Sequence, residues 1–310
     1  MPNFLSAFRI RSYRFQWGSD LLNSWAFEME TLILGWFVLV TTDSPFLLAA
    51  FAALTFSGTL LSPFFGVLAD RVDRRAILIT LRLIYGALAS VILLLALVGT
   101  VQPWQVFVIS GIAGLVRPSD FAVKFALIAD TVPTGDLHNA MGFSRATMDS
   151  ARIFGALLGA GLFSTLGIGA AYGAVVGLYL VSVLLAWRIT PIPRQASENT
   201  RPWTDLKLGF SYIRRNETIV AIMALAFLAN FTGFPIIRGL LPALARDVYG
   251  MDETGLAQLI ALLALGALLA SLATATILRV TKPARMMVIW LVVWHLFILL
   301  LGLFSIPMAA

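Results

Sequence analysis

The sequence predicts an all-α membrane protein with about nine transmembrane helices. Of its 310 residues, 59% are hydrophobic and only 12% are charged, and the mean hydropathy is +0.90. Soluble proteins carry about 25% charged residues, so this chain has too few to cover its apolar surface in water. Apolar runs of about 20 residues, the length that crosses a bilayer, follow one another along the chain. We therefore expect lipid to surround most of the fold.

The predicted spans are separated by short segments with turn chemistry. Pro, Gly, Asp and Ser interrupt the apolar pattern in "TTDSP" at 41–45, "TVQP" at 100–103 and "TLGIG" at 165–169. The spans are expected at residues 17–41, 46–69, 76–99, 103–129, 137–164, 168–189, 217–240, 253–277 and 286–306.

A polar segment at residues 190–216 divides the predicted spans into two groups. It contains three prolines and then an amphipathic pattern, which is typical of a linker with one interfacial helix. We expect residues 1–189 to form an N-terminal six-helix bundle. Residues 217–310 would form part of a C-terminal bundle with three helices.

The positions of arginine and lysine predict the orientation of the chain. With the N-terminus in the cytoplasm, most of the 22 Lys and Arg residues fall in inner segments. Only Arg238 and Arg246 lie near or in an outer loop. Because cytoplasmic loops carry an excess of positive charge, we expect the N-terminus inside.

Enzymatic and nucleic-acid-binding functions find little support in the sequence. The chain has no cysteine, and its two histidines, His138 and His295, are far apart, which argues against a zinc site. It contains no P-loop and no nucleophile elbow. The basic residues are not gathered in segments interleaved with aromatic residues. We therefore expect no metal, no other cofactor, no nucleic-acid partner and no enzymatic activity.

Charged residues inside the predicted spans are the candidate functional groups. A charge at the bilayer centre costs at least about 2.5–3.5 kcal/mol, so it normally faces a cavity or a partner. In the fourth and fifth spans, helical spacing of i, i+3 or i+4, and i+7 aligns such residues in stripes. The candidates for substrate binding and proton coupling are Glu28, Glu30, Arg117, Asp120, Asp149 and Arg152.

Two interpretations of Glu28 and Glu30 stay open. A low-dielectric interior favours the neutral form of a carboxyl group, and a nearby arginine favours the charged form. Movement of an arginine would then make either glutamate a proton carrier. Alternatively, the charges form a static network that holds the first, fourth and fifth spans together. Lys124 and Arg145 lie nearer the cytoplasmic face and are expected to snorkel.

The segment "GVLADRVDRR" at residues 66–75 lies between the second and third predicted spans. Its arginines could simply fix the loop in the cytoplasm, although Gly66 and Asp70 are not needed for that. Together with the residues up to Leu78, it resembles the loop signature of the major facilitator superfamily, G-x-L-A-D-R-x-G-R-R-x-x-L. Asp73 stands where many members carry glycine. The resemblance implies a cytoplasmic gate between two helical bundles, made of Gly66, Asp70, Arg71, Arg74 and Arg75.

Further stretches extend this resemblance and point to a branch of the family. "RIFGALLGAGL" at 152–162 is similar to the span-5 glycine motif of proton-driven exporters, through Gly155 and Gly159. Residues 203–216 and 240–272 resemble the enterobactin and siderophore exporters. The resemblance implies proton-coupled export of a siderophore-like or drug-like small molecule by alternating access, in the bacterial inner membrane. The implied partners are lipid, the substrate and protons.

The number of predicted spans leaves a second function open. The family normally has twelve spans, and this chain is expected to lack the last three. Self-association or a second chain would then be needed to complete the second bundle. The alternative to an exporter is a transport-inactive membrane protein, or an assembly partner with a structural or regulatory role.

Overall fold

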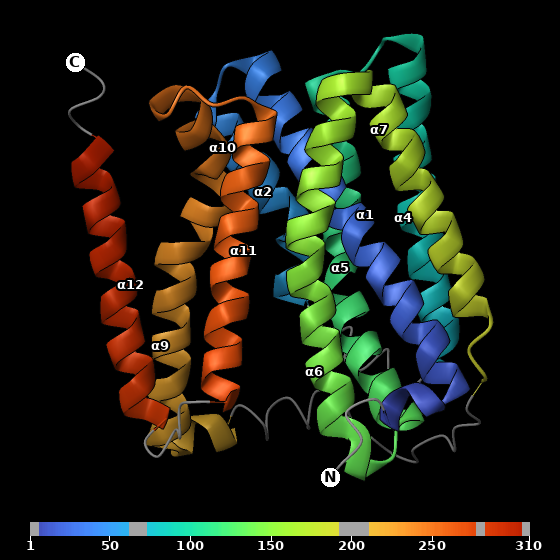
Figure 1. Ribbon diagram of the computed structural model, residues 1–310, viewed down its shortest axis with the longest axis vertical. Helices are drawn as coiled ribbons and strands as arrows, with labels where there is room; N and C mark the ends of the chain where they lie inside the picture. The colour runs from blue at the N-terminus through green and yellow to red at the C-terminus, as the bar shows by residue number, and fades with distance from the viewer. Residues whose placement is uncertain (1–5, 62–72, 192–210, 277–282, 306–310) are drawn as a thin grey trace.

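The computed structural model describes residues 6–61, 73–191, 211–276 and 283–305, and every regular element in these ranges is a helix. Long helices run side by side along one axis of the molecule (Figure 1). Six helical segments of the described residues are long and apolar enough to cross a membrane, and two further apolar helices are shorter. The predicted all-α membrane class is therefore confirmed.

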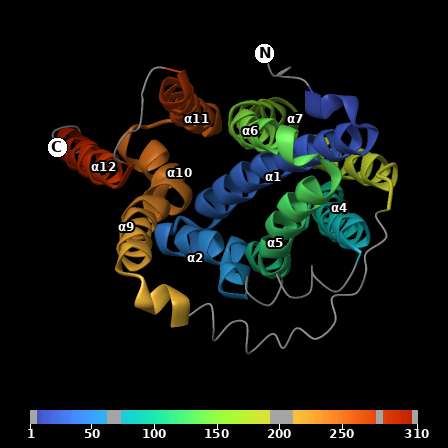
Figure 2. The same cartoon turned by 90° about the horizontal axis from the view of Figure 1, so that it is seen from below.

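The first part of the chain packs around α1, which spans Arg11–Thr42. Seen from below, α1 lies among the other helices of this part (Figure 2). The helices that surround it are α2 (Pro45–Thr55), α4 (Arg74–Val98), α5 (Pro103–Thr131), α6 (Thr134–Ser150) and α7 (Ala156–Trp187). A 3₁₀ turn, η2 (Ser57–Leu61), follows α2. The rest of the expected span 46–69 lies outside the described residues.

The first helix begins at Arg11, six residues earlier than expected. The reason is that two residues before position 17, Tyr13 and Gln16, are buried inside the molecule. The hydroxyl of Tyr13 donates a hydrogen bond to the carbonyl of Ala140 at 3.1 Å, and the amide of Gln16 donates to the carbonyl of Lys124 at 3.0 Å. These contacts with α5 and α6 extend the helix beyond its apolar run.

The helical segment Thr134–Trp187 folds back on itself in the middle. Its 54 residues would measure about 80 Å as one straight helix, more than twice a hydrocarbon core of about 30 Å. The break is at Gly167, whose φ of 78° lies in a region that favours glycine. Figure 1 shows the resulting turn at the upper end of α7. The expected boundary between two spans at 165–168 is confirmed.

The second part of the chain lies beside the first, on the left of Figure 1. It consists of α9 (Glu217–Phe234), η4 (Pro235–Leu240), α10 (Leu241–Ala243), η5 (Leu244–Val248), α11 (Glu253–Thr276) and α12 (Pro283–Ser305). The expected span 217–240 continues to Val248 through two π-helical segments. Prolines at 235 and 242 lack the N–H that an α-helix needs, which explains the irregular backbone there.

Contacts between the two parts involve α1 and α2 on one side and η4, α10 and η5 on the other. The rings of Phe56 and Phe234 meet edge to face, with centroids 4.8 Å apart. Helix α11 packs against α6, η3 and α7, where η3 is the π-helical turn Ala151–Gly155. Of the predicted interfacial helix at 203–216, only residues 211–215 are described as helical.

Candidate functional site

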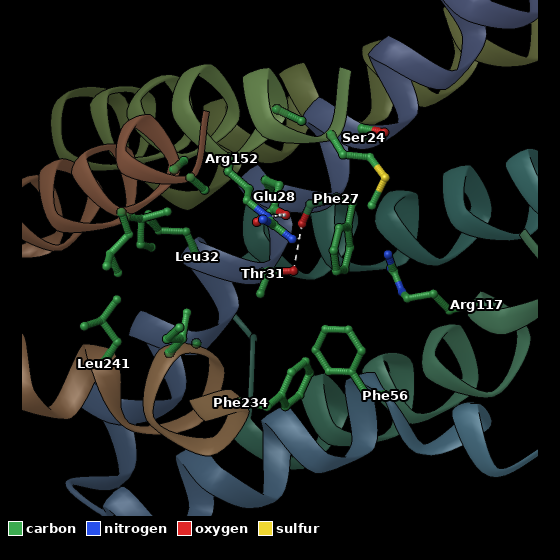
Figure 3. A pocket seen from close by; sticks show the side chains of 18 of the residues that line it. Ser24, Phe27, Glu28, Thr31, Leu32, Phe56, Arg117, Arg152, Phe234 and Leu241 are labelled. Atoms are coloured by element: carbon green, nitrogen blue, oxygen red, sulfur yellow. Dashed lines mark hydrogen bonds and ion pairs between the residues drawn. The ribbon is translucent and has the colours of Figure 1, made fainter. Parts of the chain in front are cut away.

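A cavity of about 550 Å³ lies between the two parts of the chain (Figure 3). The first part contributes side chains from α1, α2, α4, α5, α6 and η3, and the second part contributes side chains from α9 to α12. The charged lining residues are Asp20, Glu28, Arg82, Arg117, Asp120, Lys124 and Arg152. All of them belong to the first part, whereas the described lining residues of the second part are uncharged.

Two charged residues of the cavity wall, Glu28 and Arg117, lie near the middle of their helices. Glu28 is about 25 Å from the start of α1 and about 21 Å from its end. Arg117 is about 21 Å from either end of α5. In a bilayer, both side chains would therefore lie near the midplane, where a charge needs a partner or a water-filled cavity.

A buried cluster of four charges lies closer to the end of the molecule that carries the N-terminus. The guanidinium of Arg82, only 1% exposed, bonds to Asp120 at 2.5 Å and to Asp20 at 2.7 Å. The ammonium of Lys124 lies 3.9 Å from Asp20. Two carboxylates and two cations thus balance one another. Burying these charges is tolerated because each has an opposite charge beside it.

Arg152 connects Glu28 to Asp149. Its guanidinium lies 3.8 Å from the carboxylate of Glu28 and 3.4 Å from that of Asp149. Figure 3 shows Arg152 reaching over Glu28 from the neighbouring helix. Arg152 lies in η3, and a π-helical turn within an α-helix shifts the register of the residues that follow. Asp149 is buried and also pairs with the exposed Arg145, at 3.2 Å.

Two glycines bring α1 close to η3 and α7 at this point. A Cβ on Gly155 would lie 2.9 Å from the carbonyl oxygen of Trp25 and 3.1 Å from the Cβ of Glu28. A Cβ on Gly159 would lie 3.0 Å from the Cα of Met29. The glycine pair noted in the sequence therefore permits the contact that sets Glu28 beside Arg152.

Glu30 lies apart from the cavity. The hydroxyl of Tyr179 on α7 donates a hydrogen bond to its carboxylate at 3.1 Å, and Glu30 is not among the lining residues. Arg117 is close enough to Glu30 to interact electrostatically. Because neighbouring helical residues are about 100° apart around the axis, two residues separate the two glutamates by about 200°. One therefore faces the cavity and the other faces α7.

Arg117 lies against aromatic rings. Its guanidinium carbon is 3.3 Å from the centroid of Phe27 and 5.4 Å from that of Tyr85. The residue is 7% exposed and lines the cavity. Within the described residues it forms no salt bridge, and its Nε has no hydrogen-bond partner. Figure 3 shows the guanidinium extending toward Phe27.

The described residues of the predicted gate contact the first part of the chain. Arg74 bonds to the carboxylate of Asp130 at 2.7 Å, at the end of α5. Arg75 donates to the carbonyl of Trp187 at 2.6 Å, at the end of α7. Gly66, Asp70 and Arg71 lie outside the described residues, so the gate remains a prediction.

Three members of the buried cluster, Asp20, Arg82 and Lys124, were not among the predicted site residues, and one expectation was wrong. In the sequence, Arg82 is one of the many basic residues that indicate the orientation of the chain, and nothing distinguished Asp20. Lys124 does not snorkel, because it is only 4% exposed and is held beside Asp20. The available signal was that Arg82 lies about 12 Å inside its helix, too deep for an interfacial position.

Comparisons with known proteins agree with this architecture. Residues 21–310 match the Major Facilitator Superfamily. Macrolide efflux protein A of Streptococcus pyogenes is 26% identical over 192 residues, which is 60% of this chain and 47% of that protein. The protein of the same name from Enterococcus faecalis is 26% identical over 190 residues, covering 60% and 58%. The chain thus spans about half the length of these relatives.

A solved structure shows the same fold. The crystal structure of a bacterial homologue of the human lysosomal transporter Spinster, inward-facing and unoccupied, aligns with 86% of this chain and 63% of its own. The TM-score is 0.63 and the sequence identity is 15%. At this identity the likeness concerns the fold alone.

Proposed function

The chain belongs to the Major Facilitator Superfamily, and we propose that it is a secondary transporter that exports a small molecule in exchange for protons. It is an integral membrane protein, so lipid and a small-molecule substrate are its partners. Alternating access would expose the cavity first to one side of the membrane and then to the other. The efflux relatives support export, and the absence of a nucleotide-binding motif from the sequence fits secondary transport.

The observation that carries this proposal is the ion pair between Glu28 and Arg152 at the wall of a midplane cavity. Protonation of Glu28 would remove its attraction for Arg152 and leave that arginine to Asp149. Arg152 would then have two arrangements, one for each protonation state of Glu28. A two-state element of this kind can be biased both by a proton and by a substrate in the same cavity.

We assign the proton to Glu28 rather than to Glu30. Glu28 lines the cavity and would exchange protons through it, whereas Glu30 accepts a hydrogen bond from Tyr179 on the α7 side. Asp120 and Asp149 would hold their cationic partners in place. The names of the efflux relatives favour a drug-like substrate over a siderophore-like one.

The same proposal includes the arrangement of the whole chain. Residues 1–189 would form the N-terminal bundle, 190–216 the linker and 217–310 part of the C-terminal bundle. The N-terminus would lie in the cytoplasm of a bacterium, with the protein in the inner membrane. Gly66, Asp70, Arg71, Arg74 and Arg75 would form the cytoplasmic gate.

Proteoliposomes with an imposed pH gradient test the proposal. We expect radiolabelled decane sulfonate, an amphiphile whose charge does not change with pH, to accumulate only while the gradient lasts, and nigericin to abolish the accumulation. Glu28→Gln should lose this accumulation but keep exchange of labelled for unlabelled decane sulfonate, because exchange needs no net proton transfer. Glu30→Gln, on the same helix, is the matched comparison and should still accumulate the probe.

Each alternative interpretation of the glutamates, and of the chain as a whole, predicts a different outcome of this experiment. Loss of accumulation in Glu30→Gln alone would move the proton to Glu30. Unchanged accumulation in both variants would leave the static ion-pair network as the role of these glutamates. A chain that neither accumulates nor exchanges decane sulfonate would favour the transport-inactive alternative.

A further inference from the structure

Arg117 differs from the other cations that line the cavity. Within the described residues, Arg82 pairs with two aspartates, Lys124 lies 3.9 Å from Asp20, and Arg152 lies 3.8 Å from Glu28. Within the described residues, no carboxylate lies at salt-bridge distance from Arg117. Among the cations that line the cavity, Arg117 is therefore the one that forms no salt bridge within the described residues.

The aromatic contacts of Arg117 cover the face of its guanidinium but provide no hydrogen-bond acceptor for its N–H groups. Phe27 stacks on the face of the guanidinium, with its ring centroid 3.3 Å from the central carbon. Stacking covers the face of the group, but the five N–H donors of a guanidinium lie in its plane. The Nε of Arg117 is buried without a hydrogen-bond partner. A buried donor without an acceptor is costly, and a ligand acceptor would remove that cost.

Glu30 does not take the place of such a ligand. It interacts electrostatically with Arg117, but its carboxylate is bonded to Tyr179 and lies outside the cavity lining. Arg117 itself is 7% exposed and lines the cavity. Arg117 thus borders the space that a molecule in the cavity would occupy.

The cavity wall formed by the second part of the chain differs from the charged wall in its polarity. The described lining residues from α9 onward carry no charge, and most are apolar, among them Phe234, Ile260 and Trp294. A ligand that fills the space between the walls would meet a cation on one side and an apolar surface on the other. An apolar body with one anionic end matches both walls, and a guanidinium binds a carboxylate through two parallel hydrogen bonds.

We propose that the transported molecule is an amphiphilic organic anion, whose anionic group pairs with Arg117 while its apolar body lies against Phe234 and its neighbours. This inference rests on the proposed transport function and names its substrate class. Carboxylate, sulfonate and phosphate ends share the required chemistry.

Equilibrium binding to the full chain in neutral phosphatidylcholine nanodiscs tests the inference. The probes are three dansyl-decyl compounds with one apolar body and a carboxylate, carboxamide or trimethylammonium end, with empty nanodiscs as background. We expect the carboxylate to bind about tenfold to a hundredfold more tightly than the amide, as a charged hydrogen bond in a buried site provides. The ammonium compound should bind more weakly than the amide.

Substitutions separate the role of the charge from a general loss of folding. Arg117→Gln should bring the carboxylate-to-amide ratio close to one, while the amide still binds as it does to the wild type. Arg117→Lys should keep part of the preference. Arg188→Gln is the matched control, since Arg188 lies 5.7 Å from the Phe15 ring and outside the cavity lining, and it should keep the full ratio.

Several results would overturn the inference. These are equal binding of carboxylate and amide to the wild type, tightest binding of the ammonium compound, no saturable binding of any probe, or an unchanged ratio in Arg117→Gln. Binding needs no flux, so the two proposals fail separately. A carboxylate preference without flux in proteoliposomes refutes transport alone, and flux without the preference refutes this substrate class alone.

Discussion

The guanidinium of Arg246 lies 2.7 Å from the carboxylate of Asp43, so the segment after α9 is tied to the end of α1. The same guanidinium donates a hydrogen bond to the carbonyl of Leu39 at 3.1 Å. Asp43 follows α1 in a left-handed conformation, with φ of 48°, which turns its side chain out of the helix path. This contact joins the two parts of the chain at the end of α1 that lies away from the N-terminus.

Removal of this contact should let the two parts separate more often at that end. The pair is partly exposed and worth about 0.2–1 kcal/mol, so Asp43→Asn should change the equilibrium by up to about fivefold. Spin labels at Phe46→Cys and Gln258→Cys, both exposed positions, report the separation by pulsed electron resonance. The chain has no native cysteine to interfere.

Asp247→Asn is the control for this measurement. Asp247 also bonds to Arg246, at 2.5 Å, but it is the next residue in the chain and bridges nothing. The distance distribution should therefore stay as in the wild type. Identical distributions for Asp43→Asn and the wild type would show that the contact does not hold the two parts together.

Arg82→Gln should strongly destabilise the fold. It would leave Asp120, whose side chain is only 14% exposed, without its cation, and breaking a buried pair costs about 3–5 kcal/mol. The double variant Arg82→Gln with Asp120→Asn should recover much of the loss, since Asp20 keeps Lys124. The unfolding free energy, measured by reversible SDS titration, checks both expectations.

Arg145→Gln is the control for the charge cluster. Its side chain is 57% exposed, and Asp149 would keep Arg152. We expect a loss of at most about 1 kcal/mol. If Arg82→Gln were no more destabilising than Arg145→Gln, the buried cluster would not contribute to stability.

Gly155→Ala should destabilise the contact between α1 and η3. The new methyl group would meet the backbone oxygen of Trp25, which cannot move aside easily, at a cost of about 1–3 kcal/mol. Gly161→Ala, in α7, has open space at the corresponding point. It should gain roughly 0.5–1 kcal/mol from helix propensity. A similar effect of both substitutions on thermal unfolding would contradict the close approach.

Phe234→Ala should weaken binding of the carboxylate and amide probes by the same factor. The loss of apolar contact is worth about 1–2 kcal/mol, or a factor of about 5–30. Because the charge lies on the other wall, the ratio between the two probes should not change. Phe231→Ala is the control, since Phe231 stacks on Phe227 and does not line the cavity. A changed ratio in Phe234→Ala would place the anionic group near α9.

Much of the fold could be predicted from the sequence because each helix is an apolar run that ends at turn residues. Gly167 is an example, since a glycine between two long runs indicated a reversal that the structure contains. The early start of α1 could not be predicted in this way. It depends on contacts of Tyr13 and Gln16 with helices that are distant in the sequence.

The candidate site was predictable only in part, for a related reason. Helical spacing aligns Arg117, Asp120 and Lys124 on one face of α5, but it does not indicate which partner each residue meets. Arg82 bonds to Asp20 across 62 residues of sequence, and only tertiary packing brings them together. The sequence also left Glu28 and Glu30 as alternatives, because it does not show which of them faces the cavity.

The distribution of charge over the two cavity walls has a consequence for how such a chain can diverge. Substitutions from α9 onward alter the width and contour of the binding space without disturbing any of the charged lining residues that the structure describes. Mutations in the second part of the chain can therefore change which molecule fits the cavity, while the ion pairs of the first part stay intact. New specificities then arise by mutations that are individually mild.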